Sequence, residues 1–407
     1  MIAACTIAGR NALAQARVTA CSFREHQPEV PFFTLLSDDP AGLFDPAGEA
    51  FVALTLADLA VPHLEHLRFR YPQPDLSYVL TPWLLGHLLG RGFERVLFLK
   101  QETLVLAELG SLYDQLGPSA ILLTPHLPAP LAGGSQAREA AAREREILLA
   151  GVYNAGVLGV SANPVTRRFL AWWGERLNRH SLRAVEAGMH FEQRWLDFVP
   201  SLFPPVAIDR RPGSNLGHWR LPESRIEERD GRFLVDGQPL RVARFSGFDP
   251  DRPEFLTCHH QRVRVAEMGD AGARLVRRYR AALEHAGHAL ARSWPDGSSR
   301  FDDGAAIPAP VRAIHRRLTD AAAEEFGDPH RTGRGSFRRW LAERLPAPWR
   351  LTRIWREIWA DRADLQAAYP QPAGADRRAF GRWIERHGRA ECGLTDARWL
   401  SSWSGLW

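Results

Sequence analysis

The stretch Val96-Leu97-Phe98-Leu99-Lys100-Gln101-Glu102-Thr103-Leu104-Val105 decides how the rest of the chain is interpreted. An apolar run ends abruptly in charged and polar residues, a pattern that is typical of a buried strand whose end faces solvent. Lys100 is the only lysine of the chain, because the 52 basic residues comprise one lysine and 51 arginines (52 − 1). In open α/β sheets, ligands bind beyond the carboxyl ends of the strands. Lys100 is therefore a candidate binding residue.

Apolar segments before and after this stretch alternate with helix-like segments. Strands separated by helices of 10–15 residues indicate a doubly wound α/β sheet. From about residue 265 the pattern changes to arginine-, alanine- and glutamate-rich helices without convincing strands. We therefore predict a mixed α/β domain over residues 1–264 and a mainly α-helical extension over 265–407. The expected strands are 3–8, 32–36, 51–54, 95–99, 120–124 and 151–160, with 206–209, 233–235 and 242–246 completing the sheet.

Composition places the 407 residues among ordinary globular proteins, with 45% hydrophobic and 24% charged residues. No run of 18 apolar residues occurs, so no transmembrane segment is expected. The N-terminus resembles a first strand rather than a signal peptide. The four cysteines lack metal-site spacing, which favours reduced thiols in a cytoplasmic protein. The net charge of +5 comes from arginines interleaved with acidic residues, so nucleic acid is not an expected partner.

Several other segments place glycine, amide or charged residues beside the expected strands. Glycine permits close approach of a backbone to a ligand, and carboxylates before a proline can bind a ligand or form an Asx turn. The segments are Cys5-Thr6-Ile7-Ala8-Gly9-Arg10-Asn11, Ser37-Asp38-Asp39, Tyr153-Asn154-Ala155-Gly156-Val157, Phe191-Glu192-Gln193-Arg194-Trp195 and Arg244-Phe245-Ser246-Gly247.

In this order, and together with residues 97–105, these segments resemble nucleotide-sugar glycosyltransferases of the GT-A fold. The resemblance is strongest to the glycogenin-like and lipopolysaccharide galactosyltransferase family, including bacterial relatives that carry a helical C-terminal extension. It implies a GT-A fold and an enzyme that moves a sugar from a nucleotide-sugar donor to a glycan, protein or small-molecule acceptor. It also implies retention of the anomeric configuration, with the diphosphate itself as a candidate base.

The resemblance assigns expected roles to individual residues. Gln193, Glu192 and Asn154 are the expected catalytic residues near the reacting sugar carbon. The loop residues Asn215, His218 and Trp219 are expected on the acceptor side. The expected donor-binding residues are Thr6, Ile7, Ala8, Arg10, Asn11, Asp38, Asp39, Lys100, Gln101, Glu102, Gly156, Arg244 and Gly247.

The chain departs from the family at the metal site. Where the family has two aspartates and a histidine around a divalent ion, this chain has Lys100, Glu102 and Arg244. Cations repel a metal ion, but Arg and Lys can bind a diphosphate directly. Two such contacts would replace the charge neutralisation that a metal gives the leaving diphosphate. We therefore expect a metal-independent enzyme that requires no cofactor.

Other interpretations of the sequence remain open. The altered metal motif also fits a pseudo-glycosyltransferase that binds a nucleotide sugar, a glycan or a partner without catalysis. The sheet pattern alone also fits a dehydrogenase or methyltransferase, although no G-x-G-x-x-G follows the first strand. Glu102 could form a simple ion pair, and Asp38 and Asp39 a turn. Trp355 and Trp359 share a helix face that could fill a core, dock against the α/β domain, join copies of the chain through its C-terminal helices, or bind an acceptor.

Overall fold

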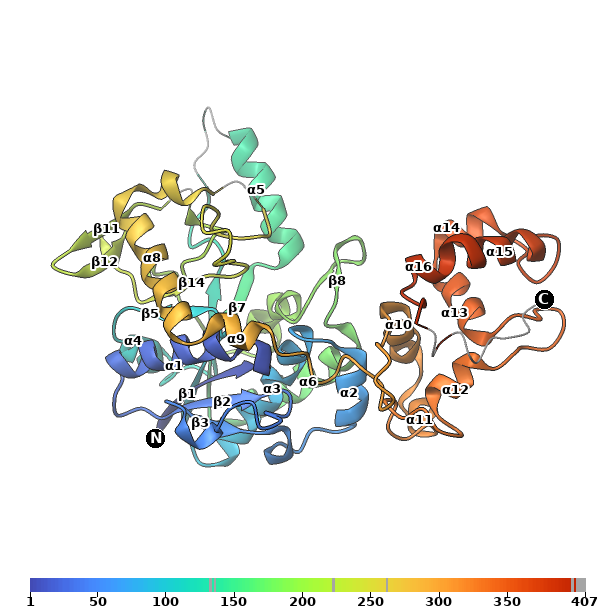
Figure 1. Ribbon diagram of the computed structural model, residues 1–407. Helices are drawn as coiled ribbons and strands as arrows, with labels where there is room; N and C mark the ends of the chain where they lie inside the picture. Colours follow the sequence, from blue (N-terminus) through green and yellow to red (C-terminus); the bar gives the residue numbers. More distant parts are fainter. Residues whose placement is uncertain (132–133, 135–136, 222–223, 261–262, 397–398, 400–407) are drawn as a thin grey trace. The chain divides into compact units, whose positions relative to one another are not determined.

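The computed structural model describes residues 1–131, 134, 137–221, 224–260, 263–396 and 399 (Figure 1). The chain divides into two compact units. The first unit comprises Met1–Val61 and Gln73–Asp296, and the second comprises Pro62–Pro72 and the chain from Gly297 onward. None of the described helices is both long enough and apolar enough to cross a bilayer.

The first unit is built on a seven-stranded mixed sheet with strand order β10-β6-β7-β4-β1-β2-β3. Strand β7 runs antiparallel to both β4 and β6, whereas the other neighbouring pairs are parallel. This arrangement confirms the predicted mixed α/β fold. The strands are β1 (Ile2–Ala8), β2 (Phe32–Leu36), β3 (Val52–Leu54), β4 (Arg95–Leu99), β6 (Ile121–Pro125), β7 (Tyr153–Ser161) and β10 (Val206–Ile208).

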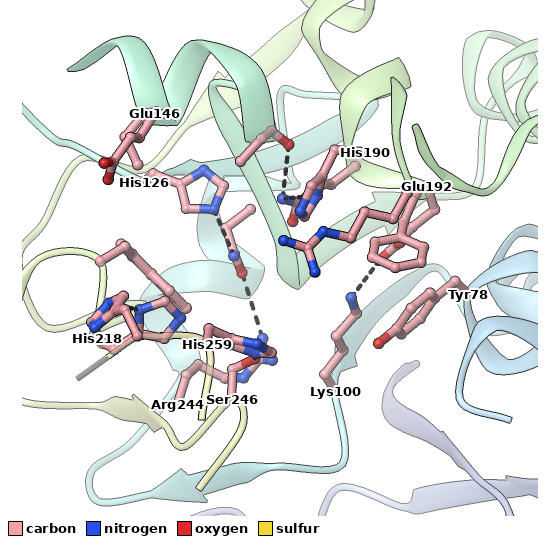
Figure 2. Close-up of a pocket in the computed structure, with 18 of the residues that line it drawn as sticks. Tyr78, Lys100, His126, Glu146, His190, Glu192, His218, Arg244, Ser246 and His259 are labelled. Carbon is pink, nitrogen blue, oxygen red and sulfur yellow. Dashed lines mark hydrogen bonds and ion pairs between the residues drawn. The ribbon is translucent and has the colours of Figure 1, made fainter. Parts of the chain in front are cut away.

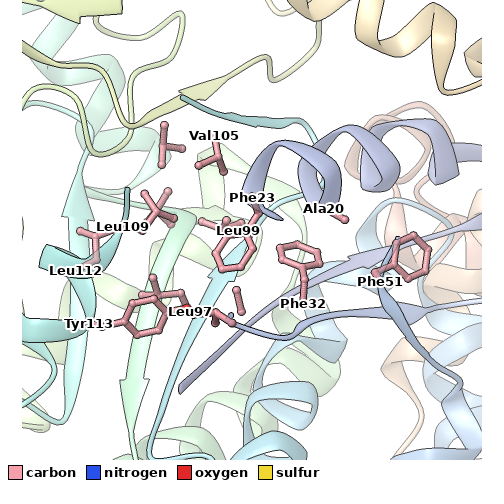
Figure 3. Close-up of a cluster of buried hydrophobic side chains, with 14 of the residues drawn as sticks. Ala20, Phe23, Phe32, Phe51, Leu97, Leu99, Val105, Leu109, Leu112 and Tyr113 are labelled. Atoms are coloured by element: carbon pink, nitrogen blue, oxygen red, sulfur yellow. The ribbon is translucent and has the colours of Figure 1, made fainter. Parts of the chain in front are cut away.

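Strand β4 lies inside the sheet and is buried on both faces. Leu97 and Leu99 lie two residues apart, and therefore point to one face, where they join a cluster with Phe23 and Phe32 (Figure 3). Phe98, which points to the other face, is only 2% exposed. The apolar run read from the sequence is therefore a central strand, and the polar residues that follow it leave the sheet together.

The last two strands expected in the sheet lie outside it. Strand β14 (Val242–Arg244) instead pairs with β5 (Thr103–Val105), and β12 (Arg232–Val235) pairs with β11 (Ile226–Arg229) and β13 (Gln238–Pro239). The prediction that residues 233–235 and 242–246 complete the main sheet is wrong. Their short apolar sequences mark strands but do not specify which strand each of them pairs with.

Helices of the first unit pack on the sheet and on these smaller strands. Helix α1 contacts β1, β2 and β5, whereas α3 and α6 pack together and α3 contacts β1 and β4. Helix α6 begins where the Asn163 side chain accepts a hydrogen bond from the Thr166 amide. The helices are α1 (Leu13–His26), α3 (Asp75–Gly90), α4 (Gly110–Gln115), α5 (Ala137–Ala150), α6 (Pro164–His180), α7 (Val199–Leu202), α8 (Gly269–His285) and α9 (His288–Arg292).

The boundary between the units lies at 296/297 rather than at the expected 264/265. Helix α8 belongs to the first unit because its apolar face packs against α1 and the small strands. Tyr279 of α8 stacks on Phe245 with ring centroids 3.8 Å apart, and Leu275 joins the same cluster. Polar composition suggested an extension here, but the buried stripe of α8 is part of the core of the first unit.

The second unit is helical, as expected, and is assembled from two separate stretches of sequence. Phe69 of α2 is fully buried between Phe301 and Phe337. Trp355 is also fully buried, and Trp359 packs on Trp349 within the unit. The helices are α2 (Leu64–Arg70), α10 (Ala309–Arg317), α11 (Asp320–Glu324), α12 (Phe337–Ala342), α13 (Arg353–Asp361), α14 (Ala363–Ala368), α15 (Arg377–Trp383) and α16 (Arg389–Glu391).

Candidate functional site

Lys100 emerges from the carboxyl end of β4 and forms a buried ion pair. Its ammonium contacts the carboxylate of Glu192, which is only 1% exposed, and lies 4.0 Å from the centroid of the Tyr78 ring (Figure 2). The Lys100 amide donates to the Gly156 carbonyl 3.0 Å away. The backbone and the side chain of the lone lysine are therefore both held in place.

Arg244 reaches the same region from β14, which pairs antiparallel with β5 so that Arg244 lies opposite Thr103. Its guanidinium is 3.5 Å from the Asn154 side-chain oxygen and 3.7 Å from a Glu102 carboxylate oxygen. A Cβ added to Gly156 would lie 1.2 Å from an Arg244 nitrogen. Gly156 was expected to allow close approach of a sugar, but in this structure it makes room for Arg244.

Asn154 joins several elements through its side chain. Its oxygen accepts from the Gly156 amide at 2.8 Å and from Asn215 at 3.1 Å, and its nitrogen donates to His126 at 3.0 Å. Asn215 also donates to Thr124. The carboxamide is thus committed within the protein. Asn154 therefore positions neighbouring groups, and the buried Asn215 supports it.

These groups border a cavity of about 460 Å³ in the first unit. Of the residues selected from the sequence, the cavity lining includes Lys100, Asn154, Glu192, Gln193, His218, Trp219 and Arg244. Four others contact this lining from behind: Glu102 and Gly156 contact Arg244, Asn215 contacts Asn154, and Gly247 lies against His259. Gly247 has a φ of +72°, and a Cβ there would meet the His259 ring at 2.9 Å.

Gln193 is buried and oriented by two contacts. Its side-chain nitrogen donates to the Ala150 carbonyl at 2.9 Å and lies 3.4 Å from Nδ1 of His190. With the nitrogen engaged, the carbonyl oxygen is the end of the amide available to a ligand. A carbonyl oxygen can stabilise positive charge that develops on a sugar carbon without itself ionising.

The expected donor-binding residues at the start of the chain lie away from this cavity. The side chains of Thr6, Ile7 and Ala8 are fully buried in β1. Arg10 donates to the carbonyl oxygens of Pro295 and Asp39, and its amide donates to Asp38 at 2.7 Å. Asp39 accepts from the Ala41 amide, as in an Asx turn. Gln101 is buried and, like Asn11, does not line the cavity. Arg10, Asp38 and Asp39, which were expected to hold a nucleoside, thus form hydrogen bonds within the chain.

The side chains at the expected metal position do not fit a divalent ion. Hard divalent cations take oxygen ligands, whereas two of the three positions here carry cations. Within the described ranges, a single group of ligand-type side chains is close enough to hold an ion: Glu65, Asp328 and His330 of the second unit. Both carboxylates of that group already face arginines, at 3.0 Å and 3.6 Å.

Five histidines line the cavity: His126, His190, His218, His259 and His260. Burial lowers the pKa of His126 to about 4 and that of His218 to about 2, and it also lowers the pKa of His190 and of His259. These four rings are therefore neutral near pH 7. His126 accepts from Asn154 through Nε2, so its proton is on Nδ1, which lies 3.4 Å from the Val152 carbonyl.

We predict that His126 makes the stability of the protein pH-dependent. Its pKa is about 4 in the folded chain and 6.5 in the unfolded chain, so the unfolded chain binds more protons between these values. Stability therefore falls as the pH is lowered from 6.5 to 4, by about 3 kcal/mol for this residue. Urea unfolding from pH 7 to pH 4 should show a smaller loss in His126→Gln. His285→Gln, at the exposed surface of α8, is the control, and an equal loss in wild type and His126→Gln would contradict the prediction.

Sequence reasoning missed several residues of the cavity, namely Tyr78, His126, Arg143, Arg183, His190 and His259. His190 stands two residues before Glu192, and His259 has a histidine neighbour, so a search for clustered imidazoles could have found both. Arg183 carries no such signal among 51 arginines (52 − 1).

No protein-family model matches the sequence. Two uncharacterized proteins of Bacillus subtilis (strain 168), YfnF and YfnD, are similar to it. YfnF is 25% identical over 249 residues, which cover 60% of this chain and 80% of YfnF. YfnD is 22% identical over 251 residues, which cover 60% of this chain and 76% of YfnD. One similar solved structure is that of the galactosyltransferase LgtC with donor and acceptor sugar analogs. It is 17% identical, the match covers 70% of this chain and 96% of LgtC, and the TM-score is 0.40. Another is the glycosyltransferase GlyE of Streptococcus pneumoniae TIGR4, which is 12% identical. The match covers 74% of this chain and 67% of GlyE, with a TM-score of 0.41.

Proposed function

We propose that this protein transfers a sugar from a nucleotide-sugar donor to an acceptor hydroxyl without a divalent ion. The observation that carries the proposal is the convergence of Lys100 and Arg244, from different strands, on one cavity that Gln193 also lines. Two fixed cations at the carboxyl end of a central strand suit a diphosphate. The bond between the anomeric carbon and the diphosphate oxygen breaks, and its electrons stay on the diphosphate. A bond to the acceptor oxygen forms, and the hydroxyl loses its proton.

The cations would supply the stabilisation of the leaving group. A unit charge about 4 Å from a phosphate oxygen contributes roughly 4 kcal/mol at an effective dielectric of about 20. Glu192 is committed to Lys100, so the leaving diphosphate is the better candidate to accept the hydroxyl proton. A reaction in which the diphosphate accepts this proton on the face it leaves retains the anomeric configuration, and retention is part of the proposal.

Metal independence gives the first test. A panel of nucleotide sugars should include one that raises the melting temperature equally in EDTA and in manganese, and sugar transfer should change less than about twofold between the two conditions. A ligand at 100 times its Kd stabilises the folded state by about 2.7 kcal/mol, which a thermal shift detects readily. Transfer that disappears in EDTA and returns with manganese would show that the ion is required.

Binding without catalysis is the second candidate function. The hydrogen bonds among Arg10, Asp38, Asp39 and Ala41 favour it, because they already use groups that were expected to hold a nucleoside. A protein of this kind would show a thermal shift with a sugar or phosphate ligand but no release of nucleoside diphosphate. Measurable transfer or hydrolysis of any nucleotide sugar would exclude it.

A further inference from the structure

A short hairpin borders the cavity and brings two polar side chains to it. Strand β8 (Arg183–Ala184) pairs antiparallel with β9 (Met189–His190), with Arg183 directly opposite His190. Residues opposite each other in an antiparallel pair project from the same face. Both residues line the cavity, so this face of the hairpin is the one turned toward it.

The connection from the hairpin to Glu192 fixes its orientation. Phe191 adopts a φ of +50°, which costs a non-glycine residue about 1–3 kcal/mol and persists only where packing enforces it. Its ring packs edge-on against Tyr78 at 5.4 Å, and Tyr78 in turn contacts Lys100. The hairpin is therefore linked by contact to the cation expected to bind the diphosphate.

Arg183 differs from the other basic residues of the cavity in its bonding. Lys100 pairs with Glu192, Arg143 donates to the Trp219 carbonyl, and Arg244 contacts Asn154. The exposed Arg183 side chain makes neither a hydrogen bond nor an ion pair with any described part of the chain. Arg183 lies directly opposite His190 in the hairpin, and its charge helps, after burial of each ring, to lower the pKa of His190 and of His259. It is a cation whose donors remain available to a ligand.

His190 adds a second donor. Its Nδ1 lies 3.4 Å from the Gln193 side-chain nitrogen, which donates to it because an amide nitrogen cannot accept. A neutral His190 then carries its proton on Nε2. Arg183 and His190 thus present donors only, from one face of one hairpin.

We propose that Arg183 and His190 form an anion-binding subsite for a phosphate group of a substrate, separate from Lys100 and Arg244. The inference rests on the proposed function in that it places the subsite in the same reaction cavity. Two sources of phosphate share this chemistry: the diphosphate of the donor, and a phosphate on the acceptor. Arg binds phosphate bidentately and an imidazole N–H can complete the site.

Calorimetric titration of the full chain separates the two sources. Inorganic pyrophosphate represents the donor diphosphate, and glucose 1-phosphate, titrated into pyrophosphate-saturated protein, represents a phosphorylated acceptor. Wild type is compared with Arg183→Gln and with Arg167→Gln, a control at an exposed arginine of α6. Loss of a charge-assisted contact should raise the Kd about tenfold or more in Arg183→Gln only.

A rise in the pyrophosphate Kd would assign the subsite to the donor, and a rise in the glucose 1-phosphate Kd alone would assign it to the acceptor. The subsite is overturned if Arg183→Gln binds both probes as wild type does, or if wild type binds neither. If a Lys100 variant binds pyrophosphate weakly while Arg183→Gln binds both probes with the wild-type Kd, the proposed function stands and the subsite does not. Arg183-dependent binding with no sugar transfer would leave the subsite standing and remove the proposed function.

Discussion

Replacing Lys100 by methionine is expected to reduce sugar transfer about a thousandfold and to destabilise the fold. Loss of roughly 4 kcal/mol of charge stabilisation at the leaving diphosphate corresponds to that change in rate. The variant also leaves Glu192, which is 1% exposed, without its partner. Removing one member of a buried pair costs about 3–5 kcal/mol because the remaining charge is uncompensated. Initial rates and urea unfolding at pH 7 measure the two effects.

The double variant Lys100→Met/Glu192→Gln separates these two effects. Both charges are gone, so most of the lost stability should return, whereas transfer and pyrophosphate binding should stay low. Glu192→Gln alone keeps the ammonium, which still contacts Tyr78, and should keep pyrophosphate binding. If the double variant recovers wild-type binding along with its stability, Lys100 acts on the fold and not on the diphosphate.

Replacing Gly156 by alanine is expected to inactivate the protein because the new methyl group displaces Arg244, which lies 88 positions further along the chain (244 − 156). The new Cβ would lie 1.2 Å from an Arg244 nitrogen and 2.5 Å from the Asn154 side-chain oxygen. Arg244 is only 4% exposed, so its guanidinium has little room to move. We expect a loss of about 1–3 kcal/mol of stability from overpacking and an activity close to that of Arg244→Ala. Unfolding curves and initial rates test both.

A double-mutant cycle shows whether the effect passes through Arg244. Once Arg244 is replaced by alanine, the methyl group that Gly156→Ala introduces should cost less, giving a coupling free energy of about 0.5–3 kcal/mol. Gly86→Ala in α3 is the matched control, since the nearest atom to its Cβ is 3.9 Å away, and it should be neutral or slightly stabilising. Strictly additive costs at 156 and 244 would mean that the glycine is needed for some other reason.

The local sequence pattern was enough to predict the seven strands of the main sheet and the position of Lys100 at the end of one of them. The apolar run before Lys100 reports burial on both faces, and a central strand is the simplest structure that provides it. A run of this kind does not identify the neighbouring strands, because a short apolar sequence can pair with a strand of any sheet. Residues 233–235 and 242–246 were therefore recognised as strands but assigned to the wrong sheet.

The site was harder to predict because its contacts join distant positions. Lys100 and Glu192 are 92 residues apart (192 − 100), and nothing local marks one as the partner of the other. Arg244 was identified only through the resemblance, whereas Arg183 had no motif around it. Neutral histidines pose a further difficulty, since the burial that lowers the pKa of His126 comes from tertiary packing. A sequence can show which groups are able to ionise, but their surroundings decide whether they do.

The second unit takes residues 62–72 from the middle of the first, and this affects how the chain can be shortened and how it is synthesised. A chain cut after residue 296 would keep Phe69 and Tyr71, both fully buried in the whole protein, and would expose them to water. Exposed aromatic surface of this kind favours aggregation. On the ribosome, α2 is complete 239 residues (309 − 70) before α10, the first of the other helices of the second unit, begins. Residues 62–72 therefore lack the rest of their unit for most of the time that the chain is being synthesised.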